Sequence, residues 1–549
     1  MKRRVRGFLL MVMLIAGSFA GIQAQGTVQG EAQLPPREWF ILDPATDNVQ
    51  GVSAEKAYNT ILKGKKSETV TVAVIDSGVD IDHEDLKGKI WVNEKEIAGN
   101  GIDDDKNGYI DDKYGWNFIG GKDGRNVEQD TYELTRIYVK LKEKYGDTEA
   151  KKVKKKDKEE YEYWLKVKED FEKTYDEAHQ QYNFYSNLRD NIVRFHTLLK
   201  AYVGVEQISL DDLRNIDTQD SIVLTARNII GMIYQNVGED ADFDQITQEL
   251  DKAVEHFGNQ VNYAFNTEFD PRGIVGDNYD DPYEKGYGNN DVKGHDPSHG
   301  THVAGIIAAN RNNELGIKGI ADNVKIMVVR AVPDGDERDK DVANAIIYAV
   351  DNGAQIINMS FGKSYSPQKE AVDKAVKYAE SKGVLLVHAA GNSSKDIDKG
   401  KNFPTKTYAG SKAKATNWLE VGASAWGEGE DFVGEFSNYG KETVDVFAPG
   451  VDIYSTTPDN KYESFNGTSM AAPNTAGVAA LLMSYYPELT AFQVKDIIAK
   501  SSRKFDNLKV TKPGKEELVD FKDLSISGGL INAYEALKMA ESMTMEKKN

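Results

Sequence analysis

Short apolar runs alternate with helical patterns in two parts of this chain, roughly residues 50–120 and 270–549. The run VTVAVI at 70–75 is typical of a buried strand, and amphipathic helical stretches at 341–352 and 368–382 separate later apolar runs. Strands that alternate with helices predict a parallel sheet with helices on both faces. In such α/β folds the reactive residues lie at the carboxyl ends of the strands.

The segment between these two parts, about 126–270, has a different composition. It contains no proline, is dense in charge, and repeats apolar residues at spacings of three and four, which indicates long helices. The apolar stripe comprises Tyr161, Trp164, Phe171, Tyr175, Ala178, Tyr182, Tyr185, Leu188, Ile192, Phe195 and Leu199, and further helical patterns cover 222–234 and 243–257. We expect an inserted all-α subdomain, either a stabilising spacer or a substrate gate or partner-binding arm. The stripe would also allow an oligomer through this insertion.

Charge and cysteine content exclude several classes of function. The formal net charge of -20 argues against a nucleic-acid partner, because a phosphate backbone needs a basic surface. The same charge is compatible with the binding of hard cations. The chain has no cysteine, which excludes disulfides, thiolate metal sites, a cysteine nucleophile and a lipid-modified N-terminal cysteine.

The N-terminus has the pattern of an export signal. A basic cluster at 2–6 precedes an apolar run at 8–20, and a plausible cleavage motif ends at Ala24. The alternative is a membrane anchor, but the run is shorter than the ~20 apolar residues that span a bilayer. We expect a signal peptide at 1–24, an N-terminal extension at 25–49, and a mature protein without a membrane span, exported to the periplasm or the medium.

Four short motifs supply the parts that acyl transfer by a serine requires. They are VAVIDSGVD at 72–80, HGTHVAG at 299–305, AAGN at 389–392 and GTSMAAP at 467–473. A serine nucleophile needs a base, an acid that orients the base, and donors for the oxyanion. His299, Asp76, Asn392 and Ser469 fall where a strand or loop meets a helix terminus. Each of these residues taken alone could equally be a helix cap, a turn residue or a core histidine. The presence of all four in one chain favours the catalytic interpretation.

These motifs, together with INMSFG at 357–362, resemble those of the subtilisin-like serine proteases (subtilases), in the order Asp, His, Ser that this family uses. The resemblance implies a subtilisin-like peptidase domain at 50–125 and 271–545, interrupted by the insertion at 126–270. It implies that Ser469 is the nucleophile and that His299 is the base and then the acid. Asp76 would orient His299, and the Asn392 side chain and the Ser469 backbone N–H would form the oxyanion hole.

The resemblance also assigns a substrate-binding site. It implies that Ser360, Phe361 and Gly362 pair with the extended backbone of the substrate, a case of strand addition. Ala389, Ala390 and Gly391 would wall the pocket for the residue before the cleaved bond. The second histidine of its motif, His302, is expected to be structural.

Two sets of residues are candidate calcium ligands. The first lies in the run DDDKNGYIDD, whose alternating oxygen ligands around a glycine resemble an EF-hand loop. The alternative is a solvated acidic turn. The candidates in this run are Asp103, Asp105, Asn107, Asp111 and Asp112. The family resemblance implies a second set, Gln50, Asp85 and Asn313. We therefore expect calcium in a structural role.

The sequence thus predicts an exported serine endopeptidase with calcium sites and polypeptide substrates. One alternative is a catalytically silent protein with a subtilase fold that binds partners through the helical insertion. Another is an esterase or amidase for small molecules, since the same acyl-enzyme would form. The segment Asn358 to Gly362, which resembles a peptide-pairing strand, favours polypeptides.

Overall fold

The computed structural model describes residues 35–237 and 243–548. The predicted signal peptide at 1–24 and the first part of the extension, 25–34, therefore lie outside the described residues. The chain divides into two compact units. The described residues of 134–269 form a helical unit, and residues 35–133 together with 270–548 form an α/β unit. Residues 126–133, which the sequence analysis assigned to the insertion, thus belong with the α/β unit.

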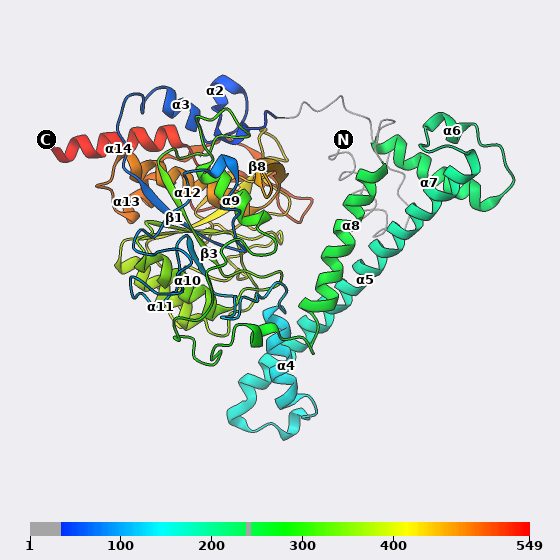
Figure 1. The fold of residues 1–549 in the computed structure, drawn as a ribbon, viewed down its shortest axis with the longest axis horizontal. Helices are drawn as coiled ribbons and strands as arrows, with labels where there is room; N and C mark the ends of the chain where they lie inside the picture. The colour runs from blue at the N-terminus through cyan, green and yellow to red at the C-terminus, as the bar shows by residue number, and fades with distance from the viewer. Residues whose placement is uncertain (1–34, 238–242, 549) are drawn as a thin grey trace. The chain divides into compact units, whose positions relative to one another are not determined.

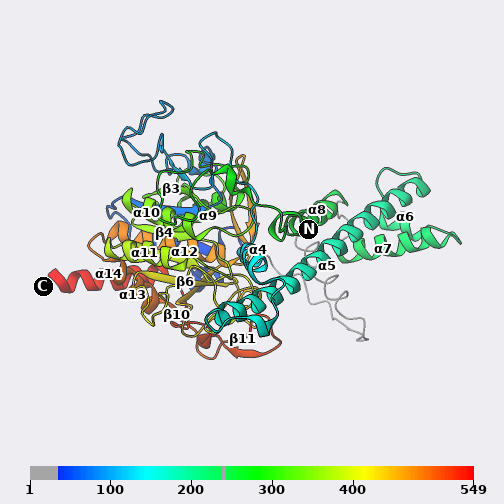
Figure 2. The same ribbon diagram turned by 90° about the horizontal axis from the view of Figure 1, so that it is seen from below.

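A nine-stranded sheet forms the centre of the α/β unit in the described residues (Figures 1 and 2). The strand order is β10-β13-β7-β6-β5-β4-β1-β3-β2. All neighbouring pairs are parallel except β10 and β13. The strands are β1 Val70–Asp76, β2 Gly115–Asn117, β3 Val324–Arg330, β4 Ile356–Met359, β5 Leu385–Ala389, β6 Trp418–Ser424, β7 Val446–Pro449, β10 Arg503–Lys504 and β13 Gly529–Leu530. Two hairpin pairs lie outside this sheet, β8 Ile453–Thr457 with β9 Lys461–Phe465, and β11 Lys509–Thr511 with β12 Leu518–Asp520.

Helices cover both faces of the sheet (Figure 1). One face carries α10 Asp339–Asp351 and α11 Lys369–Ser381, and the other carries α9 Ser298–Ala308, α12 Thr468–Tyr485, α13 Ala491–Ser501 and α14 Ala533–Lys548. Strand β1 shows why a strand in the middle of this sheet has a continuous apolar sequence. Val72 and Val74 enter the core on the α12 face, while Ala73 and Ile75 enter the core on the α10 face. A strand buried on both faces reads as a continuous apolar run, and the predicted α/β fold is confirmed.

The helical unit is built around the 46-residue helix α5, Lys158–Val203. Its other helices are α4 from Glu133 to Tyr145, α6 Leu210–Arg214, α7 Ser221–Val237 and α8 Phe243–Asn259. The C-terminal half of α5 packs against α7 and α8, with Leu199 buried in their shared core (Figures 1 and 2). In its N-terminal half, the ring of Phe171 stacks on Tyr138 of α4 at a centroid distance of 4.0 Å. The predicted inserted all-α subdomain is confirmed.

The sequence patterns agree with the observed elements to within a few residues. The apolar run 70–75 lies in β1, and the helical stretches 341–352 and 368–382 correspond to α10 and α11. Two further short α-helices, α2 Pro44–Asp47 and α3 Ala54–Asn59, precede β1 in the chain. In the part of the chain that the structure describes, no helix is long and apolar enough to cross a bilayer.

Two substitutions on α5 test the core of the helical unit. Leu199 is fully buried, whereas Leu165 on the same helix is 47% exposed. We expect Leu199→Ala to lower the free energy of unfolding of the helical unit by about 2–5 kcal/mol, because it removes buried methyl groups and leaves a cavity. Leu165→Ala should change it by less than about 0.5 kcal/mol. Urea unfolding followed by circular dichroism at 222 nm measures both, and equal effects would contradict this packing.

Candidate active site

The candidate catalytic residues gather at the carboxyl edge of the sheet. Asp76 is the last residue of β1, Ser360 follows the end of β4, and Ala389 ends β5. These three strands are neighbours in the sheet. His299 lies in the first turn of α9 and Ser469 in the first turn of α12, and both helices pack on the same face of the sheet. The topology therefore brings residues that are far apart in the sequence to one edge.

Asp76 and His299 form a hydrogen-bonded pair. His299 Nδ1 donates to Asp76 Oδ1 at 2.8 Å, and the Asp76 carboxylate is buried. Burial of the imidazole lowers the pKa of His299, but the negative charge and hydrogen bond of Asp76 outweigh that effect and raise the pKa above 6.5. Because Nδ1 carries the proton of this bond, the neutral imidazole has Nε2 free to accept one. The His299 side chain is 39% exposed, so a substrate can reach it.

The Ser469 hydroxyl lies beside the segment that follows β4. Its Oγ donates to the carbonyl of Ser360 at 3.1 Å, and Ser360 Oγ donates in return to the carbonyl of Ser469 at 2.8 Å. Ser469 is half-buried at the start of an 18-residue helix. Backbone N–H groups at a helix N-terminus lack intrahelical partners and favour negative charge.

Two nitrogen atoms that carry N–H groups, Asn392 Nδ2 and the Ser469 backbone nitrogen, lie close to one point at Gly467. Asn392 Oδ1 accepts from the backbone N–H and the hydroxyl of Thr468, each at 2.9 Å, so the Asn392 Nδ2 group faces the other way. A methyl group built on Gly467 would lie 3.4 Å from Asn392 Nδ2 and 3.5 Å from the Ser469 backbone nitrogen. Glycine keeps this space open, and a pair of donors around one open space is the arrangement that an oxyanion requires.

The two predicted substrate-binding segments, 360–362 and 389–391, lie on either side of Asn402. The Asn402 amide donates to the carbonyl of Ala389 at 3.1 Å. A Cβ atom on Gly362 would lie 2.6 Å from Asn402 Nδ2, and one on Gly391 would lie 3.1 Å from the Asn402 side chain. The sequence analysis missed Asn402, because a single asparagine outside any motif carries no local signal.

Residues 67–522 match a family model described as the subtilase family. The chain belongs to the subtilase family.

Curated relatives of this subtilase include three bacterial proteases. The chain is 45% identical to a thermophilic serine proteinase of Bacillus sp. (strain AK1) over 34% of this chain and 43% of that protein. It is 39% identical to subtilisin DY of Bacillus licheniformis over 37% of this chain and 70% of that protein. It is 42% identical to thermitase of Thermoactinomyces vulgaris over 34% of this chain and 61% of that protein. The match thus spans less than two thirds of the length of two of these three relatives.

The other histidine of the subtilase motif, His302, lies away from the reactive groups. It is fully buried, and its Nε2 lies 2.9 Å from the carbonyl of Ile453 and 3.1 Å from that of Glu463. Burial lowers the pKa of His302 to about 3, so the ring is neutral at ordinary pH. The contacts join α9 to the β8–β9 pair, which is a structural role.

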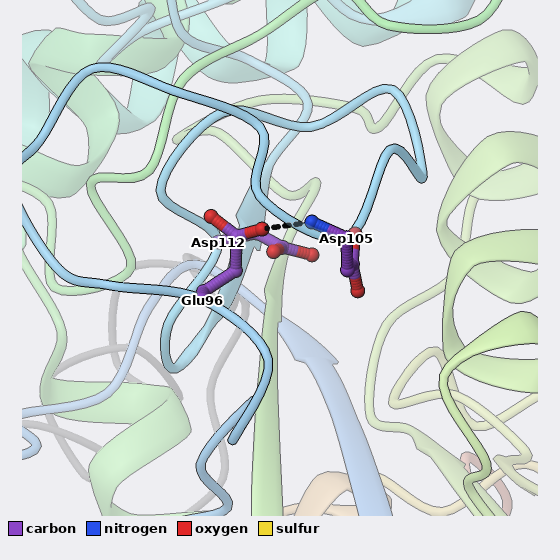
Figure 3. Close-up of side chains that lie close together, drawn as sticks. All are labelled: Glu96, Asp105 and Asp112. Atoms are coloured by element: carbon purple, nitrogen blue, oxygen red, sulfur yellow. Dashed lines mark hydrogen bonds between the residues drawn. The ribbon is translucent and has the colours of Figure 1, made fainter.

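In the acidic loop, three carboxylates come together (Figure 3). Glu96, Asp105 and Asp112 each offer an oxygen within 4.8 Å of the others. Glu96 Oε1 accepts from the backbone N–H of Asp105 at 3.0 Å, whereas its Oε2 is buried without a hydrogen-bond partner among the described residues. Burial raises the pKa of Asp112 to about 6, and the nearby charge of Asp105 adds to this effect. Such a cluster has the oxygen ligands that Ca²⁺ prefers.

The five predicted loop ligands separate into two kinds. Asp105 and Asp112 belong to the cluster, and Asn107 Nδ2 donates to Asp112 Oδ2 at 2.9 Å. Asp103 instead accepts from the backbone N–H groups of residues 107 and 108, and Asp111 accepts from those of residues 100 and 101. These two carboxylates shape the loop. Glu96 was missed by the sequence analysis because it lies outside the DDDKNGYIDD run.

The second predicted calcium set is only partly gathered. Asn313 Nδ2 donates to Asp85 Oδ1 at 2.8 Å, and the backbone N–H of Ile317 donates to Asp85 Oδ2 at 3.2 Å. Gln50 Nε2 donates to Glu428 at 2.8 Å. Gln50 Oε1 is buried without a hydrogen-bond partner among the described residues. Gln50 Oε1 is therefore available as a ligand for a cation.

The contact between Asp76 and His299 predicts a measurable pKa change. Asp76→Asn removes the negative charge that favours the imidazolium, so burial should then dominate and the pKa of His299 should fall below its wild-type value. Histidine NMR titration measures it, with His299→Gln to assign the signal. Asp82→Asn, at an exposed position, removes the same charge as a control. An unchanged pKa in Asp76→Asn would contradict the pairing.

Proposed function

We propose that this subtilase is an exported serine endopeptidase that hydrolyses peptide bonds of proteins through an acyl-enzyme on Ser469. The observation that carries the proposal is that Asn392 Nδ2 and the Ser469 backbone nitrogen lie 3.4 and 3.5 Å from one point, that of a Cβ atom built on Gly467, where they can serve as donors to one oxygen. Donors placed in advance around a developing oxyanion are usually the largest single contribution to catalysis of acyl transfer. Export is supported by the basic and apolar pattern at 2–24.

In the proposed reaction the Ser469 hydroxyl turns from the Ser360 carbonyl toward His299 Nε2. His299 takes the hydroxyl proton as Oγ attacks the substrate carbonyl, and the oxyanion is held by the two N–H donors. His299 then gives the proton to the leaving amine. In the second half of the reaction, water gives its proton to His299 and attacks the acyl-enzyme, which releases the acid product and returns the proton to Ser469. Asp76 keeps Nδ1 protonated and stabilises the imidazolium that forms in each half of the reaction.

Substrates in this proposal are extended polypeptides that add a strand along Ser360–Gly362. Among the described residues, the backbone N–H and carbonyl of Gly362 make no hydrogen bond, which supports an open strand edge. The residue before the cleaved bond would enter beside Asn402, whose amide lies between Gly362 and Gly391. A polar amide at that position would limit the size of this side chain and offer it a hydrogen bond.

Replacement of the nucleophile tests the proposed function. Ser469→Ala should abolish hydrolysis of unfolded casein by the purified mature protein in calcium buffer, with kcat reduced about 10⁶-fold, the effect that loss of the nucleophile has in subtilisin. Ser411→Ala, at an exposed serine in a surface turn, should retain wild-type activity. Casein cleavage that persists in Ser469→Ala would refute the assignment. Absence of cleavage in all three proteins would favour a binding role through the helical unit.

We also propose that the cluster Glu96, Asp105 and Asp112 holds a structural calcium ion. Three carboxylates this close repel one another, and a divalent cation removes the repulsion and supplies the unpartnered Glu96 Oε2 with a ligand. Asp85, Asn313 and Gln50 are proposed as a second calcium site. Both assignments concern stability, because neither set includes a residue proposed for catalysis.

A pair of neighbouring glutamates provides the test of the first calcium site. Glu96 is buried in the cluster, whereas Glu94 is exposed. Calcium at 100-fold excess over its Kd would stabilise the wild type by about 2.7 kcal/mol, so chelation with EDTA should lower Tm by several degrees. Glu96→Gln should shrink the difference in Tm between calcium and EDTA, and Glu94→Gln should leave it unchanged. An equal difference in all three proteins would contradict a cation at this cluster.

A further inference from the structure

A buried histidine–glutamate pair lies next to the substrate-binding segments, outside the residues proposed for catalysis. His388 lies on β5, one residue before Ala389, and Glu420 on β6 is its partner in register. The two residues are 0% and 2% exposed. Burial of ionisable groups costs free energy unless they are paired and hydrogen-bonded. The hydrogen bonds that His388 and Glu420 make therefore indicate the role of the pair.

Both ring nitrogens of His388 face oxygen acceptors. Nδ1 lies 2.9 Å from Glu420 Oε1, and Nε2 lies 2.9 Å from the backbone carbonyl of Phe361. The backbone carbonyl of Phe361 can only accept a hydrogen bond, so His388 Nε2 carries a proton and donates to it. The hydrogen bond between Nδ1 and Glu420 Oε1 orients the ring for this contact.

The surroundings of the pair hold Glu420 in place. Its other oxygen, Oε2, accepts from the indole N–H of Trp418 at 2.8 Å. The next carboxylate, Asp445, accepts from the backbone N–H of Glu420 at 2.8 Å and from Lys406 Nζ, also at 2.8 Å. The Glu420 side chain is thus fixed between Trp418 and His388.

The carbonyl that His388 holds belongs to the substrate-binding segment. Successive carbonyls of an extended chain point to opposite sides. The Ser360 carbonyl accepts from the Ser469 hydroxyl, on the side of the catalytic serine, and the next carbonyl, that of Phe361, points to His388. Two backbone bonds between Lys363 and Phe403 hold the far end of the segment. The contact with His388 sets the plane of the Phe361 peptide and hence the direction of the groups on either side.

We propose that His388 is a positioning residue for substrate binding: with its ring oriented by Glu420, it holds the Phe361 carbonyl so that Ser360–Gly362 presents its open edge to an extended polypeptide. This inference rests on the proposed endopeptidase function. His388 acts through Phe361 and does not touch the substrate. Replacement of the His388 side chain should therefore weaken binding of substrates that pair with Ser360–Gly362. Hydrolysis of substrates that do not pair with this segment should be unaffected.

Two substitutions of buried histidines separate this role from a structural one. His388→Phe keeps a ring but removes both donors. His83→Phe is the control, because His83 is also buried and its Nε2 lies 3.2 Å from a backbone carbonyl, that of Lys461, on β9. Both variants are assayed with a fluorogenic peptide that copies a casein bond cleaved by the wild type, and with p-nitrophenyl acetate, which has no peptide backbone to pair.

His388→Phe should lower kcat/KM for the peptide about 10–100-fold, mainly by raising KM, because it leaves the buried Phe361 carbonyl without its hydrogen-bond donor. Ester hydrolysis should change less than about 2-fold, and the ratio of peptide to ester activity in His83→Phe should equal that of the wild type. An unchanged peptide rate, or equal losses on both substrates, would overturn the positioning role while the proposed function stands. A wild type that cleaves neither substrate would refute the proposed function itself.

Nitrogen-15 NMR of histidine-labelled protein tests the inference without activity, and does so even if His388→Phe fails to fold. The wild type should show a proton on His388 Nε2, the nitrogen that faces the Phe361 carbonyl. In Glu420→Gln, the side-chain amide can donate to Nδ1, so the proton on Nε2 should remain. An Nε2 without a proton in the wild type would overturn the inference.

Discussion

The register of the parallel strands β1, β4 and β5 is the constraint on which the site depends. Ile75, Met359 and His388 lie in one row across these strands. The residues that follow them are Asp76, Ser360 and Ala389, so the proposed orienting acid, the segment beside the proposed nucleophile and the proposed pocket wall lie together at the carboxyl edge of the sheet. A slip of one residue in any strand would turn its side chains to the opposite face. The unbroken apolar runs that bury both faces therefore also align the reactive groups.

Arg338, just before α10, joins the two segments of the α/β unit that flank the insertion in the chain. It donates to Asp130 with two nitrogens at 2.7 and 2.9 Å and to Asp270 with one at 2.9 Å. Asp130 precedes the helical unit in the sequence and Asp270 follows it. Arg338 and Asp130 are buried, so this pair is costly to break, whereas the Asp270 side chain is 71% exposed.

Much of the fold and part of the site could be predicted from the sequence. Strand β1 and helices α10 and α11 were predictable because their periodicity is local. Asp76, His299, Asn392 and Ser469 could be named because each lies in a short contiguous motif. The acidic loop was harder. The spacing of its aspartates shows that oxygen ligands are abundant, but it does not show which carboxylates turn inward, and Asp103 and Asp111 bind backbone N–H groups instead.

By itself, the sequence determined the class of fold, the helical character of the insertion predicted at 126–270 and the candidate reactive side chains, because propensity, periodicity and motifs act over a few neighbouring residues. Only the tertiary structure decided which distant residues meet. Asn402 lies between two glycines of other segments, and Glu96 joins two aspartates of a loop motif that does not include it. His388 binds the carbonyl of Phe361, in the segment that follows the neighbouring strand β4. Such contacts depend on strand order and register across helical crossovers, and no local pattern encodes them.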